Sequence, residues 1–192
     1  MKINWRGYEF KWIQGGLGML TENIAGHVHS KNSYELHYII GGKGELLTAE
    51  KSYNLSEEMF FITGPNVYHE QKTKKEDPLT EVHCYLQCSG RKTNDILGNI
   101  FFEHHFYIGQ QKKFKRYFLN IAKELEQKNI GYESIVECNL EYILTEYTRS
   151  FIKEYKLPKK EDMSDLNDAR FLQIEVELMT NGDDVTLRSE EH

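Results

Sequence analysis

Four histidines and a glutamate in the first seventy residues are spaced so that their side chains could share one pocket. His27 and His29 are two residues apart, and residues two apart on a β-strand point to the same face of the sheet. The next strand-like segment places Glu35 and His37 on one face, and His69 follows a second apolar segment. If these polar faces turn into one interior, imidazoles and a carboxylate converge there in a binding site or a metal site.

The same residues allow two kinds of chemistry. Three imidazoles, from His27, His29 and His69, with Glu35 as a fourth ligand, could hold a divalent transition metal such as Fe, Mn, Ni or Zn. Without a metal, the side chains would line a pocket and form hydrogen bonds with a polar ligand. We favour the second interpretation, so we predict no cofactor and keep the metal as the alternative.

Aromatic residues extend the candidate site. Trp12 belongs to an aromatic N-terminal segment that either covers the mouth of a barrel and stacks on a ligand or contributes to the core. Tyr38 and Tyr85 are candidates through strand alternation alone. No serine or cysteine stands in an activating context, so we predict no catalytic residue. The predicted ligand-binding residues are His27, His29, Glu35, His37, Tyr38, His69, Trp12 and Tyr85.

Short strand-like segments position these residues. Apolar and polar residues alternate over 8–12 and again over 82–88, and residues 34–40 form a mostly apolar run. The glycines of 15–18 predict the end of the first strand, and the glycine-rich segment 41–44 is typical of a hairpin turn. Many short strands with closely spaced turns indicate a sandwich or a barrel.

The periodicity changes after residue 90. Apolar residues at helical spacing predict one amphipathic helix from Gln111 to about Lys128 and a longer one from about Tyr132 to Tyr155. The stripe on the longer helix is broader than one neighbour needs, so we expect it to pack on the barrel and also to form a homodimer seam. The stripe consists of Val136, Leu140, Ile143, Tyr147 and Phe151, widened by Ile135, Leu144 and Ile152.

Composition limits the function classes. The net charge of −6 argues against nucleic-acid binding by the residues present, because affinity for phosphates comes largely from Lys and Arg. No apolar run approaches membrane-spanning length, and the N-terminus lacks the apolar core of a signal peptide, so we expect a cytoplasmic protein without membrane contacts. The 3 cysteines show no disulfide framework, in agreement with a reducing compartment.

The first half of the chain resembles the cupin superfamily, in which histidines, a glutamate and glycines recur in two motifs. The matching positions are His27, His29, Glu35, Gly42 and His69. The spacer 30–34 is longer than in most metal-binding cupins. Glu58 and Asn66 stand where the second motif has glycines.

A narrower resemblance covers nearly the whole chain. Residues 34–44, 62–71 and 123–132 resemble the effector-binding domain of AraC-type bacterial transcription regulators. Residues 168–174 and 185–187 resemble the first helix and the entry of the helix-turn-helix region in that family. Too few residues follow to build the recognition helix that reads the major groove. Contact with DNA would therefore need a C-terminal domain that is absent from this chain.

The resemblance implies an α+β fold, in which a cupin-like jelly-roll barrel is followed by two long amphipathic helices and a terminal helix fragment. It implies three regions: an effector-binding barrel over 1–90, a helical dimerisation region over 91–157, and a linker with the start of a truncated helix-turn-helix domain over 158–192.

The function predicted from these observations is ligand sensing and dimerisation in an AraC-type regulator, and not catalysis. The effector would be a small polar metabolite such as a sugar, because polar groups beside aromatic surfaces suit a hydroxyl-rich ligand. The alternative is a stand-alone cupin enzyme, an isomerase or a dioxygenase, with a metal at His27, His29, Glu35 and His69. A third reading is a dimerisation module whose barrel binds nothing.

Overall fold

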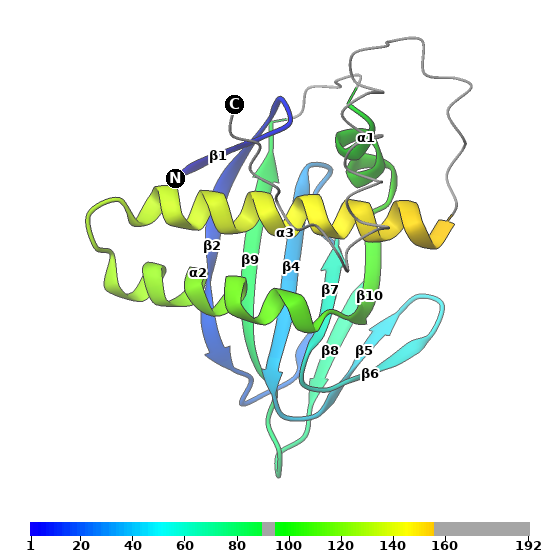
Figure 1. Ribbon diagram of the computed structural model, residues 1–192. Coiled ribbons are helices and arrows are strands. Elements are labelled where there is room, and N and C mark those ends of the chain that lie inside the picture. The colour runs from blue at the N-terminus through cyan, green and yellow to red at the C-terminus, as the bar shows by residue number, and fades with distance from the viewer. Residues whose placement is uncertain (90–94, 156–192) are drawn as a thin grey trace, which may run out of the picture. The chain divides into compact units, whose positions relative to one another are not determined.

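Two antiparallel sheets face each other in the computed structural model, which describes residues 1–89 and 95–155 (Figure 1). In spatial order, the six-stranded sheet contains β1 (Lys2–Trp5), β2 (Tyr8–Met19), β9 (Thr80–Cys88), β4 (Ser33–Gly41), β7 (Met59–Thr63) and β10 (Phe106–Gln110). The four-stranded sheet contains β3 (Ile24–His27), β8 (His69–Thr73), β5 (Gly44–Thr48) and β6 (Ser52–Leu55). The chain passes repeatedly from one sheet to the other, which is the jelly-roll arrangement.

Alternation along β4 separates two environments. Leu36 and Tyr38 are fully buried on the outer face of the six-stranded sheet, and Tyr38 stacks on Phe118 of the helical layer. Glu35 and His37 point the opposite way, into the space between the sheets. One strand therefore supplies both the hydrophobic layer under the helices and the polar wall of the interior, as the sequence predicts.

Helices cover the outer face of the six-stranded sheet. The short α1 (Ile96–Glu103) precedes β10, and the 3₁₀ turn η1 (Lys112–Phe114) leads into α2 (Lys115–Gln127), which is followed by α3 (Tyr132–Tyr155). In Figure 1, α2 and α3 run across the sheet. The two long helices lie where the periodicity predicts them, whereas α1 and β10 were not predicted.

The predicted homodimer stripe on α3 faces its own barrel. Tyr147 packs against Phe60 of β7 with ring centroids 6.1 Å apart, and Leu140 is fully buried. Val136, Ile143, Tyr147 and Phe151 are also buried within the chain. These side chains are occupied by intramolecular packing, so the prediction of a seam through them is corrected.

The interior between the sheets has an apolar part and a polar part. The apolar part is a cluster of fully or almost fully buried side chains, namely Ile39, Leu46, Leu55, Phe61 and Leu79. The polar part begins at His37, whose ring stacks on Phe61 with a centroid distance of 4.3 Å. The core thus supports one flank of the polar residues directly.

Two turn predictions are wrong. The segment 41–44 is not a hairpin, because β4 and β5 belong to different sheets and the turn carries the chain between them. At its centre, Gly42 has φ 80°, and a Cβ there would lie 2.0 Å from the carbonyl oxygen of Pro78. The glycines of 15–18 do not end a strand either, since β2 continues to Met19 and pairs with β9, with a bulge after Trp12.

Strands and helices form one unit from Met1 to Phe151. Residues beyond position 90 contribute β10, which pairs with β7 and completes the six-stranded sheet. The predicted linker and helix-turn-helix start over 158–192 lie outside the described residues. Among the helices in the described part of the chain, none has the length and apolarity needed to cross a bilayer.

Candidate functional site

Four of the predicted site residues converge between the sheets. His27 ends β3, His29 follows it, Glu35 lies on β4 and His69 begins β8. The pairing of β3 with β8 places His27 directly opposite His69, and His29 forms an isolated bridge with Pro65 just before β8. One ligand atom from each of the three histidines and from Glu35 lies within 4.8 Å of the others. Local strand pairing therefore produces the cluster that alternation predicts.

The histidines of this cluster are oriented by the backbone. Nδ1 of His27 lies 2.9 Å from the carbonyl oxygen of Ala25, and Nδ1 of His69 lies 3.1 Å from that of Val67. Each Nδ1–H donates to its carbonyl, so Nε2 is the ring nitrogen that faces the cluster. Nε2 of His29 instead lies 3.0 Å from Oε2 of Glu35.

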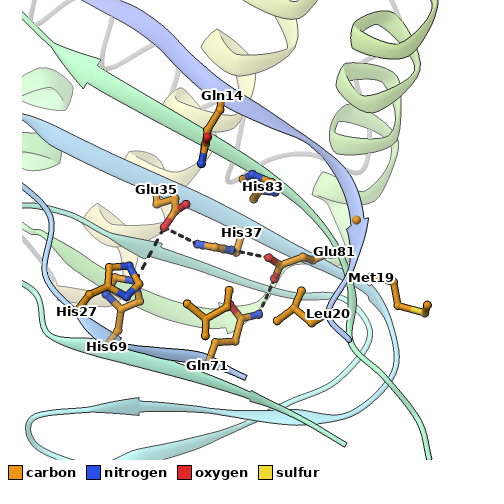
Figure 2. Close-up of a pocket in the computed structure, with 12 residues that line it drawn as sticks. Gln14, Met19, Leu20, His27, Glu35, His37, His69, Gln71, Glu81 and His83 are labelled. Atoms are coloured by element: carbon orange, nitrogen blue, oxygen red, sulfur yellow. Dashed lines mark hydrogen bonds and ion pairs between the residues drawn. The ribbon is translucent and has the colours of Figure 1, made fainter. Parts of the chain in front are cut away.

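His37 lies between two carboxylates. Its Nδ1 is 3.1 Å from Oε1 of Glu81, and its Nε2 is 3.3 Å from Oε2 of Glu35, although this second contact is not aligned as a hydrogen bond. Gln71 Nε2 donates to the other oxygen of Glu81 at 2.6 Å. Figure 2 shows the resulting row from Glu35 through His37 and Glu81 to Gln71. The row connects the histidine cluster to the far wall of the cavity.

The electrostatics of the row follow from these contacts. Burial alone would lower the pKa of His37, but Glu81 and Glu35 reverse this effect and raise it to about 10. Burial alone would raise the pKa of Glu35, but the charge of His37 and the hydrogen bond with His29 hold it well below its usual value. His37 likewise outweighs burial at Glu81 and lowers the pKa of that carboxyl. At neutral pH the row contains two carboxylates and one imidazolium.

Two other histidines of the cavity, His69 and His83, have neutral rings at pH 7. Burial lowers the pKa of His69 to about 4, and the nearby positive charges of other histidines act in the same direction. Burial also lowers the pKa of His83, which lies opposite His37 on β9. Neutral imidazoles can accept hydrogen bonds or bind metals, which imidazolium ions cannot.

The polar row borders a cavity of about 420 Å³. Its walls come from both sheets and consist of Gln14, Gly18, Met19, Leu20, Ile24, His27, Glu35, His37, His69, Gln71, Glu81 and His83. The space exists partly because β2 has glycines opposite two of these polar residues. Gly16 is paired with His83 and Gly18 with Glu81, and a Cβ at either glycine would meet no atom within 4 Å.

The other predicted site residues are placed differently. Tyr85 reaches the cluster, with its ring 5.1 Å from that of His29. Tyr38 does not line the cavity, because it lies on the opposite face of β4 against Phe118. Trp12 is also outside the cavity, since its register with the buried Leu86 places it on the helix-covered face. Tyr38 and Trp12 are therefore withdrawn as candidates for contact with a ligand in this cavity.

Several lining residues were missed in the sequence. Glu81 lies two residues before His83 on β9, Gln71 lies two residues after His69 on β8, and Gln14 follows the β2 bulge. For Glu81 and Gln71 the signal was present, because extending strand alternation by one step from a neighbouring histidine reaches each of them. Gln14 could not be found in this way, because a bulge shifts the alternation by one residue.

Structural comparisons return proteins of low sequence identity. ToxT from Vibrio cholerae, solved with an unsaturated fatty acid bound, is 11% identical over 97% of this chain and 67% of its own, with a TM-score of 0.49. A cupin protein from Bacteroides fragilis is 16% identical over 47% of this chain and 73% of its own, with a TM-score of 0.35. A predicted oxalate decarboxylase from Thermotoga maritima is 16% identical over 45% of this chain and 90% of its own, with a TM-score of 0.37.

Comparisons by sequence give a clearer result. No curated protein matches the chain. The family described as the AraC-like ligand binding domain matches residues 21–144, which is more than half of the chain. The matched segment runs from just before β3 into α3 and includes the histidine cluster and the polar row. The chain therefore belongs to the AraC-like ligand-binding domain family.

Proposed function

We propose that this chain is the effector-sensing part of an AraC-type transcription regulator and that a small polar effector binds in the cavity between the sheets. Membership of the ligand-binding family supports a sensing role over a catalytic one. The observation that carries the proposal is the cavity itself, because a space of about 420 Å³ with convergent polar groups on both walls suits a small metabolite.

The lining favours a ligand with several hydrogen-bonding groups. Gln14 and Gln71 offer amides, Glu35 offers a carboxylate, and Leu20 and Ile24 offer apolar contacts. A sugar or a related polyol combines these properties, since its hydroxyl groups both donate and accept while its C–H faces are apolar. A sugar-like ligand is therefore our starting expectation.

Dimerisation is a second part of the proposal. The inner stripe of α3 is occupied, but Ile135 on α3 is 43% exposed and Leu119 on α2 is 38% exposed. These side chains lie on the two helices that cover the sheet and could contact a second copy of the chain.

A thermal-shift panel tests the effector role. Sugars, sugar acids, amino compounds and divalent metals are added separately to the purified chain, and a ligand of the cavity raises the midpoint of unfolding. The effect should disappear in Glu35→Gln and persist in Glu45→Gln, which makes the same change on β5 outside the cavity. If no polar compound stabilises the protein, or if Glu35→Gln responds as the wild type does, the effector proposal is rejected.

Metal binding is the second candidate, and one observation favours it. Backbone carbonyls hold Nδ1–H of His27 and His69, which is how proteins commonly fix histidines that bind metal through Nε2. With His29 and Glu35 these residues provide the donor set that Zn²⁺, Fe²⁺ or Mn²⁺ accepts, and such an ion would act as a Lewis acid in an isomerase or a dioxygenase.

Elemental analysis separates the two candidates. A sensor without metal should be purified with far less than one metal ion per chain and should keep its unfolding midpoint in EDTA. Stoichiometric metal that is lost in a His27→Ala, His69→Ala double variant would support the metal site and the enzyme class.

A further inference from the structure

The outer edge of the six-stranded sheet is only half covered. β1 pairs with β2 over residues 8–11, and the N–H of Trp12 donates to the carbonyl oxygen of Met1 at 3.0 Å. Beyond Trp12, β2 continues to Met19 with β9 as its one neighbour among the described strands. Residues 13–19 therefore form an open strand edge about 20 Å long, in line with the part that β1 occupies.

The backbone of this edge offers hydrogen-bonding groups at every second residue. The N–H of Leu20 donates to the carbonyl oxygen of Leu79, on the β9 side, at 2.8 Å. Successive residues of a strand direct their N–H and C=O groups to opposite sides, so those of Gly15, Leu17 and Met19 point to the open side. Donors and acceptors with this spacing match the backbone of another strand.

This edge lacks the charged residues and prolines by which proteins commonly keep exposed strands from pairing. Residues 12–20 are all uncharged and include no proline. Leu17 and Met19 are each 58% exposed, and Ile13 is 42% exposed. A bulge lies at the start of the open stretch, and the pairing with β9 is regular beyond it. The edge is therefore both able to pair and apolar.

A second copy of the chain does not suit this edge. Phe118 of α2 stacks on Tyr38, and Tyr38 lies in register with Val82. Val82 in turn pairs with Leu17, so α2 crosses the sheet near the middle of the open edge, and in Figure 1 the turn that joins α2 to α3 extends beyond β2. Antiparallel pairing of two β2 strands would place both helical layers on the same side, where the two turns would meet. A single strand brings no helix and fits.

We infer that the open edge of β2 binds an extended peptide segment of a partner protein, which joins the sheet as a strand in line with β1. The bound segment is uncharged. It carries apolar side chains on the face of Leu17 and Met19, and small polar ones on the opposite face, beside Gly16 and Gly18. This peptide site goes beyond the proposed effector role, because pairing with the edge needs no ligand in the cavity.

Capped octapeptides of alternating valine and threonine test the inference. The first is N-methylated at its threonines, so it can pair through its valines but cannot form sheets with itself. The second is N-methylated at every residue, and the third at its valines only. Titrations are followed by NMR of the whole isotope-labelled chain. The first peptide should bind about tenfold or more tightly than the second, because only the first forms backbone hydrogen bonds. It should bind about threefold or more tightly than the third, which presents threonines to Leu17 and Met19.

Hydrogen exchange locates the pairing. In the free chain the amides of Gly15, Leu17 and Met19 should exchange faster than those of Gly16 and Gly18, which face β9. At a concentration of the first peptide about ten times its Kd, exchange of the first three amides should slow by about tenfold. The other two amides should change little.

Two matched variants connect binding to the edge. Leu17→Lys adds a charge to the open edge and should weaken binding of the first peptide by about fivefold or more. Val28→Lys makes the same change at an apolar residue outside β2 that is 55% exposed, and should leave binding unchanged. Thermal unfolding shows whether both variants are folded. The comparison of the three peptides on the wild-type chain does not depend on either variant.

Three outcomes would overturn the inference. The first is that no peptide binds at millimolar concentration, or that the first peptide binds no more tightly than the other two. The second is that the protected amides lie outside residues 13–19. The third is that Leu17→Lys changes the sedimentation of the chain alone, because the edge would then pair with a second copy. In each case the effector role is unaffected, since the thermal-shift panel tests it at the cavity.

Discussion

His37 is the residue on which the polar interior depends. It is 3% exposed, its two nitrogens contact two carboxylates, and its ring stacks on the core residue Phe61. Without it, Glu35 and Glu81 would face each other in a low-dielectric space. A buried charge pair that loses one partner costs more than the pair itself contributes, because the remaining charge has lost its solvation as well.

Replacement of His37 should therefore destabilise the protein. In His37→Phe the aromatic stacking can persist, but the cation is lost, and we expect the free energy of unfolding to fall by about 3–5 kcal/mol. His83→Phe, on the same face of the neighbouring strand, breaks no ion pair and should cost much less. Urea unfolding at pH 7 measures both values, and equal losses in the two variants would contradict the assigned role of His37.

The same group predicts how stability depends on pH. The raised pKa of His37, about 10, contributes stability that is complete below its unfolded value of about 6.5 and is lost as the pH rises. The lowered pKa values of Glu35 and Glu81 contribute stability that is lost as the pH falls below about 4.3. The lowered pKa values of His69 and His83 contribute stability that is lost as the pH falls below about 6.5. Stability should thus be highest near pH 6.5 and should decline by up to about 1.4 kcal/mol per pH unit above it.

Urea unfolding across this pH range checks the prediction. The alkaline decline should be much weaker in His37→Phe, because the titrating group is absent. A profile that rises from pH 7 to pH 9 in the wild type would mean that His37 is neutral in the folded protein.

Two left-handed residues explain a departure noted in the sequence. Glu58 has φ 69° and Asn66 has φ 63°, and both stand at positions where the cupin motif that this chain resembles has glycine. Both residues thus have the left-handed backbone conformation that glycine adopts most easily. This conformation costs little for asparagine but roughly 1 kcal/mol for a glutamate.

Glu58→Gly should consequently stabilise the protein. We expect a gain of about 0.5–1 kcal/mol, because the relief of backbone strain exceeds the extra entropy of glycine in the unfolded chain. Glu57→Gly is the matched control, since Glu57 is not among the positive-φ residues and its ion pair with Lys115 would be lost. Thermal unfolding of both variants measures the difference, and a destabilised Glu58→Gly would show that its side chain has a role of its own.

At the scale of elements, sequence reasoning succeeded where one strand or helix is regular. The alternation of β4 correctly assigned Glu35 and His37 to one face and Leu36 to the other. Helical periodicity gave α3 its bounds, Tyr132–Tyr155. In these segments the pattern follows directly from backbone geometry, which the sequence contains.

Sequence reasoning failed where the result depends on which elements become neighbours. The glycines of β2 look like a strand end, yet they lie in register with the polar residues of β9 and leave space for the cavity. Tyr38, predicted as a site residue from alternation alone, instead lies on the face of β4 that the helices cover, where it stacks on Phe118. The apolar stripe on α3 predicts a homodimer seam, because a sequence does not show how much of the helix the barrel covers.

α3 allows packing and association to be tested separately. Leu140→Ala removes a fully buried side chain from the helix–sheet layer and should lower the free energy of unfolding by about 2–5 kcal/mol. Ile135→Ala changes a side chain that is 43% exposed and should cost less than about 1 kcal/mol. If these helices form the proposed dimer, Ile135→Ala should shift sedimentation toward monomer.

Sedimentation velocity over a range of protein concentrations provides the measurement. A wild-type chain that remains monomeric at high micromolar concentration would remove the dimer proposal, without affecting the packing role of Leu140.

At the scale of the whole unit, the cavity and the helical layer lie on opposite faces of the same sheet. Glu35 and His37 line the cavity, and the alternate residue Tyr38 contacts Phe118 of α2. A ligand that changes the position of β4 therefore acts on both layers. Such coupling needs two arrangements of the helices that the ligand distinguishes, and each variant proposed above can be examined for it.

The stacking of Tyr38 on Phe118 gives the proposed signal from the cavity a short path to the helices. His37, which lines the cavity, and Tyr38, which contacts a helix, are adjacent in the chain and joined by one rigid peptide unit. Signal transfer across the barrel would then require no relay through the hydrophobic interior. A small rotation of β4 on ligand binding would then change the position of Tyr38 against Phe118 of α2.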